Sequence, residues 1–323
     1  MRPRIALALL SLLACRGQDR AHAPLRLGYF PNLTHAQALV GVADGTFARA
    51  LEVPLEPRRF NAGPAAMEAL LSDDLDAAYV GPGPAAIAYL RSRGQALRVV
   101  AGAVSGGAML VVRPEVHSAR DLVGRRVASP QLGNTQDVAL RTWLRAQGLG
   151  AEGGPGAATV TPMANPDMAA LLSRGDLAGA FVPEPWGALL RERVGGRILL
   201  DERTLWPGGR FPTTLLVVST RALKERRSQV VALLRAHLAL TERWARDPAA
   251  FARAANAQYE SLTDKPLPEP ILSEAFARLE PVTDPMRAQT EEMARRAHAL
   301  GYAPDGDLSG IVDGSLLEEL ARQ

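Results

Sequence analysis

The chain has 323 residues, of which 47% are hydrophobic and 22% are charged. This length suits two domains of ordinary size, and this composition is typical of a folded globular protein, which excludes a disordered or fibrous chain. The 37 basic and 34 acidic residues nearly balance, so nothing in the charge indicates a nucleic-acid partner. After residue 15 no apolar run is long enough to span a membrane as a helix.

The first 15 residues have the pattern of an export signal. Arg2 and Arg4 precede the apolar stretch 5–13, and small residues lead to Cys15. The ending LLAC is similar to a bacterial lipobox, in which the cysteine carries lipid and starts the mature chain. We then expect residues 16–24 to form a tether and the mature protein to be periplasmic or otherwise extracytoplasmic, anchored to a membrane through the lipid alone. A plain signal peptide with an incidental cysteine is the alternative.

From residue 25 onward, short strand patterns alternate with helix patterns. In the first part, strands are predicted at 25–29, 55–60, 77–80, 97–101 and 109–112, and helices at 35–50, 64–72 and 84–93. In the second part, strands are predicted at 125–129, 158–162, 179–182, 198–200 and 214–219, and helices at 135–147 and 166–174. Residues 222–323 are mostly helical. This order predicts an α/β fold with mixed, mainly parallel sheets flanked by helices.

Two pairs of segments repeat between these parts. MEALLSDDLDAAYVGPGP (67–84) aligns with MAALLSRGDLAGAFVPEPW (168–186), and PNLTHAQAL aligns with PQLGNTQDVAL. The second alignment predicts that Thr34 and Asn134 are N-caps of equivalent helices. Two similar lobes are the simplest interpretation, although short strand–helix units also resemble one another by chance.

Two apolar strands of similar sequence, AMLVVR at 108–113 and TLLVVS at 214–219, bracket the second part. We expect them to be two crossing strands that act as a hinge. The first lobe would then comprise residues 24–110 plus 214–323, and the second lobe residues 111–213. Ligands in open α/β sheets bind beyond the carboxyl ends of the strands, so a cleft between the lobes is the expected site.

Signatures of common enzyme classes are absent from the sequence. There is no phosphate-binding loop, dinucleotide fingerprint, zinc-protease motif or nucleophile elbow. The five histidines never occur at metal-ligand spacing, so no metal and no cofactor are predicted. Lipidation of Cys15, the only cysteine, would also leave no thiol for catalysis. These features favour binding without chemistry over an enzyme.

Five strand-to-helix turns are rich in Gly, Pro and small polar residues. They occur at 31–35, 61–64, 81–84, 132–135 and 183–186. Their free backbone N–H groups and helix N-termini can together hold an oxyanion without a buried lysine or arginine. Any single turn of this kind also has a purely structural use. Of the neighbouring Arg58 and Arg59, at most one can face the cleft, because adjacent strand residues point to opposite faces.

These segments resemble the solute-binding proteins of ABC importers for nitrate, sulfonate, taurine and related compounds. The residues that carry the resemblance are LRLGYFPNLTHAQALVG, FNAGPAAMEALL, DAAYVGPGPAAIAY, VASPQLGNTQDVALRTWL, FVPEPWGALL and DLSGIVDGSLLEELA. They extend from about residue 25 to the end and are most similar to the aliphatic-sulfonate branch. The resemblance implies a two-lobed type II periplasmic-binding-protein fold that closes over a solute and delivers it to an ABC permease with its ATPase.

The resemblance also implies where the ligand binds. It places around the cleft Asn32, Thr34, Gly63, Gly81, Gly133, Asn134, Thr135, Glu184 and Trp186; the turns themselves add His35 and Gly83. Glu184 is a carboxylate that a sulfonate does not need, so it either binds an amino group on the ligand, as in taurine, or bonds to backbone. We expect a monomer that captures a small organic anion, most simply an alkanesulfonate or taurine. An enzyme or sensor of the same fold, binding a pyrimidine or another small metabolite, is the alternative.

Overall fold

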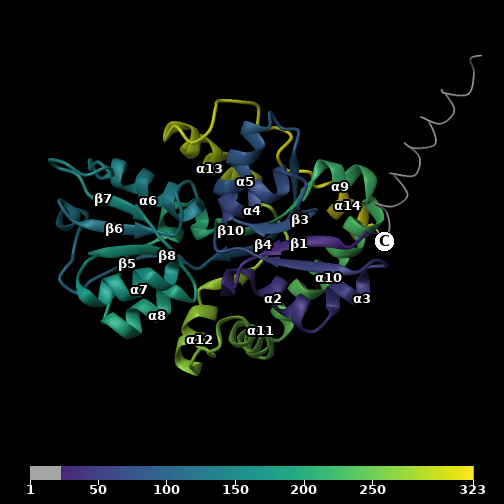
Figure 1. Ribbon diagram of the computed structural model, residues 1–323, viewed down its shortest axis with the longest axis horizontal. Helices are drawn as coiled ribbons and strands as arrows, with labels where there is room; N and C mark the ends of the chain where they lie inside the picture. The colour runs from purple at the N-terminus through teal and green to yellow at the C-terminus, as the bar shows by residue number, and fades with distance from the viewer. Residues whose placement is uncertain (1–22, 323) are drawn as a thin grey trace, which may run out of the picture.

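Two mixed β-sheets, each flanked by helices, form two lobes that lie side by side (Figure 1). This computed structural model describes residues 23–322. The predicted signal peptide, Cys15 and most of the predicted tether therefore lie outside the described residues. None of the described helices is both long and apolar enough to cross a membrane.

The first lobe contains a six-stranded sheet. Its strands are β1 (Leu25–Tyr29), β2 (Leu55–Arg59), β3 (Ala77–Val80), β4 (Leu97–Gly106), β10 (Pro212–Ser219) and β11 (Leu279–Pro281), in the order β11-β4-β10-β3-β1-β2. Its helices are η1 (Leu33–His35), α2 (Ala36–Ala43), α3 (Thr46–Ala50), α4 (Gly63–Leu71), α5 (Pro82–Arg91), α9 (Thr220–Glu225), α10 (Arg227–Arg246), α11 (Pro248–Thr263) and α14 (Ser315–Ala321).

The second lobe contains a five-stranded sheet. Its strands are β5 (Ala108–Val112), β6 (Arg126–Ser129), β7 (Thr159–Pro162), β8 (Gly179–Pro183) and β9 (Arg197–Asp201), in the order β7-β6-β8-β5-β9. Its helices are η2 (Ala119–Leu122), α6 (Thr135–Ala146), α7 (Asn165–Arg174) and α8 (Trp186–Val194), and η3 (Glu202–Leu205) and η4 (Pro207–Gly209) lead back to the first lobe. The predicted α/β class with two mixed sheets is confirmed.

The two sheets have the same plan. In each, three parallel strands stand side by side, β2-β1-β3 and β7-β6-β8, and an antiparallel strand follows, β10 or β5. The strands β3, β5, β8 and β10 are buried along their whole length, which explains their continuous apolar sequences. The similarity of AMLVVR and TLLVVS therefore reflects equivalent central positions in the two sheets.

The crossing between the lobes differs from the expectation. Residues 108–110, predicted in the first lobe, belong to β5 and pair in the second sheet, whereas β10 pairs only in the first sheet. Neither strand crosses the boundary. The chain crosses at Gly106 and Gly107, whose φ angles of 80° and 74° let it turn where a residue with a side chain would be strained. It returns through η3 and η4.

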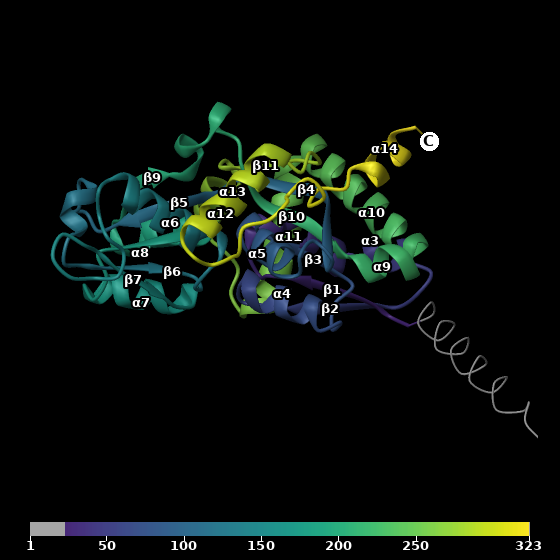
Figure 2. The same cartoon turned by 90° about the horizontal axis from the view of Figure 1, so that it is seen from above.

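Two C-terminal helices, both predicted to belong to the first lobe, pack against both lobes. The helix α12 (Glu269–Phe276) packs against α8 of the second lobe and α11 of the first, and α13 (Arg287–Ala299) packs against both α5 and α6 (Figure 2). The predicted helix 35–50 is also interrupted. Gly45, with φ 75°, separates α2 from α3, and Asp44 accepts a hydrogen bond from the N–H of Thr46 at the new helix start.

Candidate functional site

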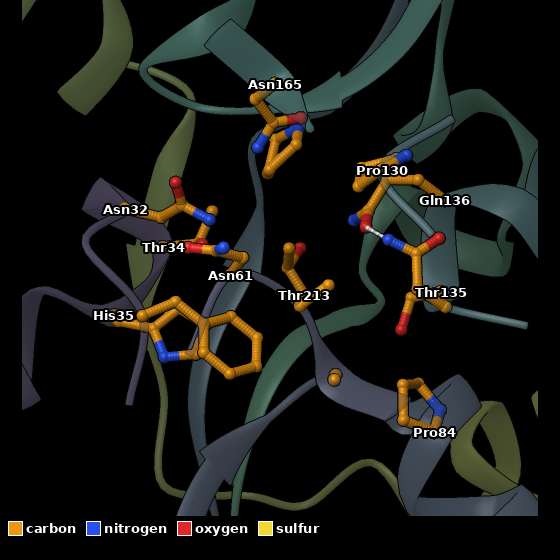
Figure 3. A pocket seen from close by; sticks show the side chains of 16 residues that line it. Asn32, Thr34, His35, Asn61, Pro84, Pro130, Thr135, Gln136, Asn165 and Thr213 are labelled. Carbon is orange, nitrogen blue, oxygen red and sulfur yellow. Dashed lines mark hydrogen bonds between the residues drawn. The ribbon is translucent and has the colours of Figure 1, made fainter. Parts of the chain in front are cut away.

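A polar cavity lies between the lobes at the carboxyl ends of strands from both sheets (Figure 3). The segments that follow β1, β2 and β3 line it with Phe30, Asn32, Thr34, His35, Asn61, Ala62, Gly63, Gly81 and Pro84. The segments that follow β6 and β7 line it with Pro130, Asn134, Thr135, Gln136 and Asn165, and the strands β8 and β10 add Pro183 and Thr213. We call this set the cavity. It offers about 30 Å³ to solvent, enough for two or three water molecules at about 10–15 Å³ each, so the lobes are closed on each other.

Most of the predicted ligand residues lie at this cavity. The ones that line it are Asn32, Thr34, His35, Gly63, Gly81, Asn134 and Thr135. Trp186 lines a wider opening next to the cavity, and Gly133 lines a separate groove beside α5. Gly83 and Glu184 line neither the cavity nor the wider opening.

Glu184 is fully buried, and its carboxylate is occupied within the protein. One oxygen accepts a hydrogen bond from the guanidinium of Arg278 at 3.1 Å, and the other accepts from the backbone N–H of Ala188 at 3.0 Å. Burial raises the pKa of Glu184 to about 7, against the opposing effects of both donors. A ligand amino group therefore has no access to this carboxylate, and the second of the two options for Glu184 is the one that the structure shows.

The start of α6 is held rigidly. Asn134 is its N-cap, as predicted, and accepts a hydrogen bond from the N–H of Asp137 at 2.8 Å. The buried carboxylate of Asp137 in turn accepts from Ser129 Oγ at 2.7 Å, from the N–H of Gly133 at 3.0 Å and from Arg141 Nε at 3.0 Å. These bonds fix the turn that presents Thr135 and its neighbours to the cavity. The tyrosine hydroxyl of Tyr302, beyond α13, donates to the same carboxylate at 2.9 Å.

The equivalent start in the first lobe is built differently. Thr34 was predicted as an N-cap, but it lies inside the short helix η1, and neither η1 nor α2 has a side-chain cap. The turn after Phe30 closes by backbone bonds before α2 begins, so the Thr34 side chain is free to line the cavity. The alignment of Thr34 with Asn134 therefore correctly places both residues at the cavity, but the predicted N-cap role of Thr34 is wrong.

Gly81 and Gly83 allow the second lobe to approach. The N–H of Gly83 donates to Thr135 Oγ1 at 3.2 Å across the interface. A Cβ atom on Gly81 would lie 2.2 Å from Thr135 Oγ1, and one on Gly83 would lie 3.0 Å from Thr135 Cα. Both glycines thus serve closure of the lobes. Because Thr135 Oγ1 already accepts from Gly83, its own proton remains to be donated.

Two amides are oriented in the same way. Asn32 Oδ1 accepts a hydrogen bond from the indole N–H of Trp186 at 3.2 Å, which leaves the NH₂ group of Asn32 without a partner among the described residues. Gln136 Oε1 accepts a hydrogen bond from Asn134 Nδ2 at 3.1 Å, the bond drawn in Figure 3. The NH₂ group of Gln136 is thereby left without a partner among the described residues. Together with Thr135, these side chains have their acceptors satisfied and their donors available.

The other polar side chains of the cavity are neutral. Burial lowers the pKa of His35 to about 3, so its imidazole is uncharged at physiological pH, and its Nδ1 has no hydrogen-bond partner among residues 23–322. Asn165 Oδ1 is also buried and unpartnered in this part of the chain, and Thr213 donates its proton to the carbonyl of Gly106. No Asp, Glu, Lys or Arg lines the cavity within the described residues.

A wider, solvent-open space adjoins the cavity, and we call it the vestibule. It shares Asn32, Asn61, Ala62, Pro130 and Asn165 with the cavity and adds Pro31, Arg59, Phe60, Ala65, Gln131, Pro162, Met163, Ala164, Pro166, Trp186 and Thr263. Its volume is about 680 Å³. No group of three or more His, Cys, Asp or Glu that could hold a metal ion occurs in the described part of the chain.

Several lining residues were not predicted. Asn61 and Gln136 lie within or beside predicted turns, but only the structure shows that their side chains face the cavity. Asn165 follows β7 as Gly63 follows β2, and the PMANP segment has the same strand–turn–helix pattern, so the repeat contained a signal for it. Thr213 lies at the start of a strand and carries no local signal.

Comparisons with known proteins agree with this architecture. The family model described as "NMT1-like family" matches residues 18–258. The taurine-binding periplasmic protein of Escherichia coli (strain K12) is 25% identical over 278 residues, which cover 86% of this chain and 73% of that protein.

Two solved structures share the fold. The alkanesulfonate-binding protein SsuA from Xanthomonas axonopodis pv. citri, bound to MOPS, superposes with a TM-score of 0.73 at 19% identity, covering 90% of this chain and 96% of that one. The periplasmic nitrate-binding protein NrtA from Synechocystis PCC 6803 has a TM-score of 0.76 at 16% identity, covering 93% and 88%. The predicted two-lobed fold of periplasmic binding proteins is confirmed.

Proposed function

The chain belongs to the NMT1-like family, and we propose that it is the solute-binding component of an ABC importer, which captures a small organic oxyanion between its lobes and delivers it to the permease and ATPase. The names of its relatives support this role: one is a taurine-binding periplasmic protein, and one structural neighbour is an alkanesulfonate-binding protein. We infer an organic sulfonate as the ligand.

One observation carries the choice of an anion. Asn32, Thr135 and Gln136 all have their acceptor atoms bonded within the protein, so what they offer to the cavity is N–H and O–H. A sulfonate has acceptor oxygens and no donor, so it matches these three side chains. Hydrogen bonds to an ionised group are stronger than neutral ones, so a few neutral donors are enough to hold it.

The position of these donors supports capture by closure. Asn32 belongs to the first lobe, and Thr135 and Gln136 belong to the second. An anion that accepts from all three bridges the lobes and stabilises the closed form over the open one. The absence of a charged group from the described lining keeps the interaction moderate, which suits a solute that must be released. We propose binding without catalysis, by a monomer that needs no metal or cofactor.

We extend the proposal to the N-terminus. Residues 1–15 would be an export signal ending at Cys15, the lipid on Cys15 would anchor the protein, and the lobes would work outside the cytoplasm. The periplasmic location in the name of the Escherichia coli relative supports export. Replacement Cys15→Ser is expected to release the protein from the membrane fraction; continued membrane association would contradict lipidation.

The ligand is best tested by thermal unfolding of the chain that lacks residues 1–15. The panel contains alkanesulfonates, taurine, nitrate, bicarbonate, phosphonates and pyrimidines. A ligand at 100 times its Kd stabilises the folded form by about 2.7 kcal/mol, a readily measured increase in Tm. We expect this increase with sulfonates. An increase with pyrimidines alone would favour the enzyme or sensor alternative, and no increase with any compound would refute the proposal.

A further inference from the structure

The vestibule contains a single charged side chain among its described lining residues, Arg59. Arg59 is the last residue of β2 and is exposed. Within residues 23–322 no hydrogen bond or ion pair holds its guanidinium. Its neighbour Arg58 faces the other way and pairs with Glu56 at 2.7 Å. Only Arg59 of the two arginines faces the vestibule, because adjacent strand residues point to opposite faces.

The rest of the vestibule is largely apolar. Its walls include Phe60, Met163, Pro166 and Trp186. The indole N–H of Trp186 is bonded to Asn32 Oδ1, so the ring offers the vestibule mainly apolar surface. This space can therefore hold carbon chains or rings, with a cationic group at one side.

The cavity and the vestibule can hold different parts of one ligand. The cavity has room only for a compact group, whereas the vestibule, about 680 Å³, is much larger and shares five lining residues with it. A ligand whose sulfonate lies in the cavity must therefore place the rest of its structure in the vestibule, beside Arg59.

We propose that the vestibule is a subsite for the tail of the ligand and that it selects sulfonates whose apolar tail ends in an acidic group. This inference rests on the proposed function. The Arg59 guanidinium attracts a carboxylate or a second sulfonate and repels an ammonium group. No carboxylate lines the cavity or the vestibule in the described chain, and Glu184 is bonded to Arg278 and Ala188, so nothing near the tail compensates an amino group. A dianionic tail-bearing sulfonate is therefore preferred to an aminosulfonate.

The expected change in affinity is small because the Arg59 side chain is exposed to solvent. Ion pairs open to water change affinity by about two- to fivefold, and salt screens them. The preference is therefore expected to be about two- to fivefold at low ionic strength, and to weaken as salt is added.

The test is calorimetric titration of the chain that lacks residues 1–15, at low and high salt, with three sulfonates of equal tail length: 4-sulfobutanoate, butane-1-sulfonate and 3-aminopropane-1-sulfonate. We expect affinity to fall in that order. Arg59→Gln should remove most of the difference between the charged tails, while Arg58→Gln, the matched control on the same strand, should keep the order.

Each outcome is informative. The inference is overturned if the aminosulfonate binds as tightly as the other two, or if Arg59→Gln leaves the order unchanged. In either case butane-1-sulfonate still binds and the proposed function stands. If none of the three sulfonates binds, the proposed function fails and the inference fails with it.

Discussion

The two lobes share one strand plan, yet they shape the cavity in different ways. The first lobe contributes close-lying backbone at Gly63 and Gly81 and the amide of Asn32, whereas the donors of the second lobe, Thr135 and Gln136, both come from the capped start of α6. The sharpest contrast is between the equivalent turns after β3 and β8. The first has glycines that admit Thr135 from the other lobe, and the second has Glu184, which is bonded to Arg278.

This contrast shows that equivalent turns can each contact the other lobe through a different interaction, a backbone N–H bonded to a hydroxyl in one case and an ion pair in the other. The turn after β3 makes its contact at the cavity, where it bears on ligand closure. In the turn after β8, Glu184 makes its contact away from the cavity, with Arg278, which directly precedes β11, so Glu184 bears on how the lobes are held together.

The largest effect is expected at Glu184. Its pKa is about 7 in the folded protein, above an ordinary value of 4.5 in the unfolded chain. Between these pH values the folded protein holds a proton that the unfolded chain has lost, so the free energy of unfolding falls as pH rises from about 4.5 to 7, by up to about 3 kcal/mol. Glu184→Gln should reduce this slope in urea unfolding at several pH values, and the part that remains is expected from the buried Glu202, whose pKa burial raises to about 8. An unchanged slope would show that Glu184 does not titrate there.

The next largest effect is expected at Gly81. A methyl group there overlaps Thr135 Oγ1, so Gly81→Ala should oppose closure and weaken sulfonate binding by about 2–3 kcal/mol, measured by titration calorimetry. The Tm of the ligand-free protein should change little if the free protein is open. In the double variant with Thr135→Ala, which removes the overlapping Oγ1, the loss should be smaller than the sum of the two single losses. Additive losses would contradict the steric explanation.

A smaller effect is expected at the donor itself. Thr135→Val keeps the shape of the side chain but removes the hydroxyl, and with it both the donor to the ligand and the acceptor for the N–H of Gly83. Sulfonate affinity should therefore fall by about 2 kcal/mol or more. Thr135→Ser is the control and should bind nearly as well as the parent chain. If Thr135→Val binds sulfonate normally, the Thr135 hydroxyl does not donate to the ligand. The start of α6 would then contribute fewer donors to the cavity than proposed.

The smallest effect is expected at Tyr302. Arg91 of the first lobe donates to the carbonyl of Tyr302 at 2.9 Å, and the hydroxyl of Tyr302 donates to Asp137 of the second lobe, so this residue connects the lobes. Tyr302→Phe removes that one bond while Asp137 keeps its other donors, and affinity should fall by about 1 kcal/mol. Binding kinetics should show faster ligand release. Unchanged release would indicate that the bond persists in the open form.

Local sequence patterns predicted much of this molecule. The strands 25–29 and 77–80 match β1 and β3, and the N-cap at Asn134 is present as expected. These features depend on neighbours in the chain: side-chain alternation, continuous apolar runs and a capping side chain three residues before its donor. The strand-to-helix turns were found for the same reason, and they brought most of the predicted ligand residues to the cavity.

What the tertiary structure decided is which partner each side chain meets. Glu184 was recognisable as an unusual carboxylate, but its bond to Arg278 joins residues far apart in the sequence. The role of Gly81 depends on Thr135 from the other lobe, and the donor character of Asn32 depends on Trp186. The sequence by itself thus determined the two-lobed α/β architecture and the turns that form the site, because propensity, periodicity and capping are local. Packing of the lobes decided which donors remain for a ligand, because a polar atom becomes available or occupied only when distant segments meet.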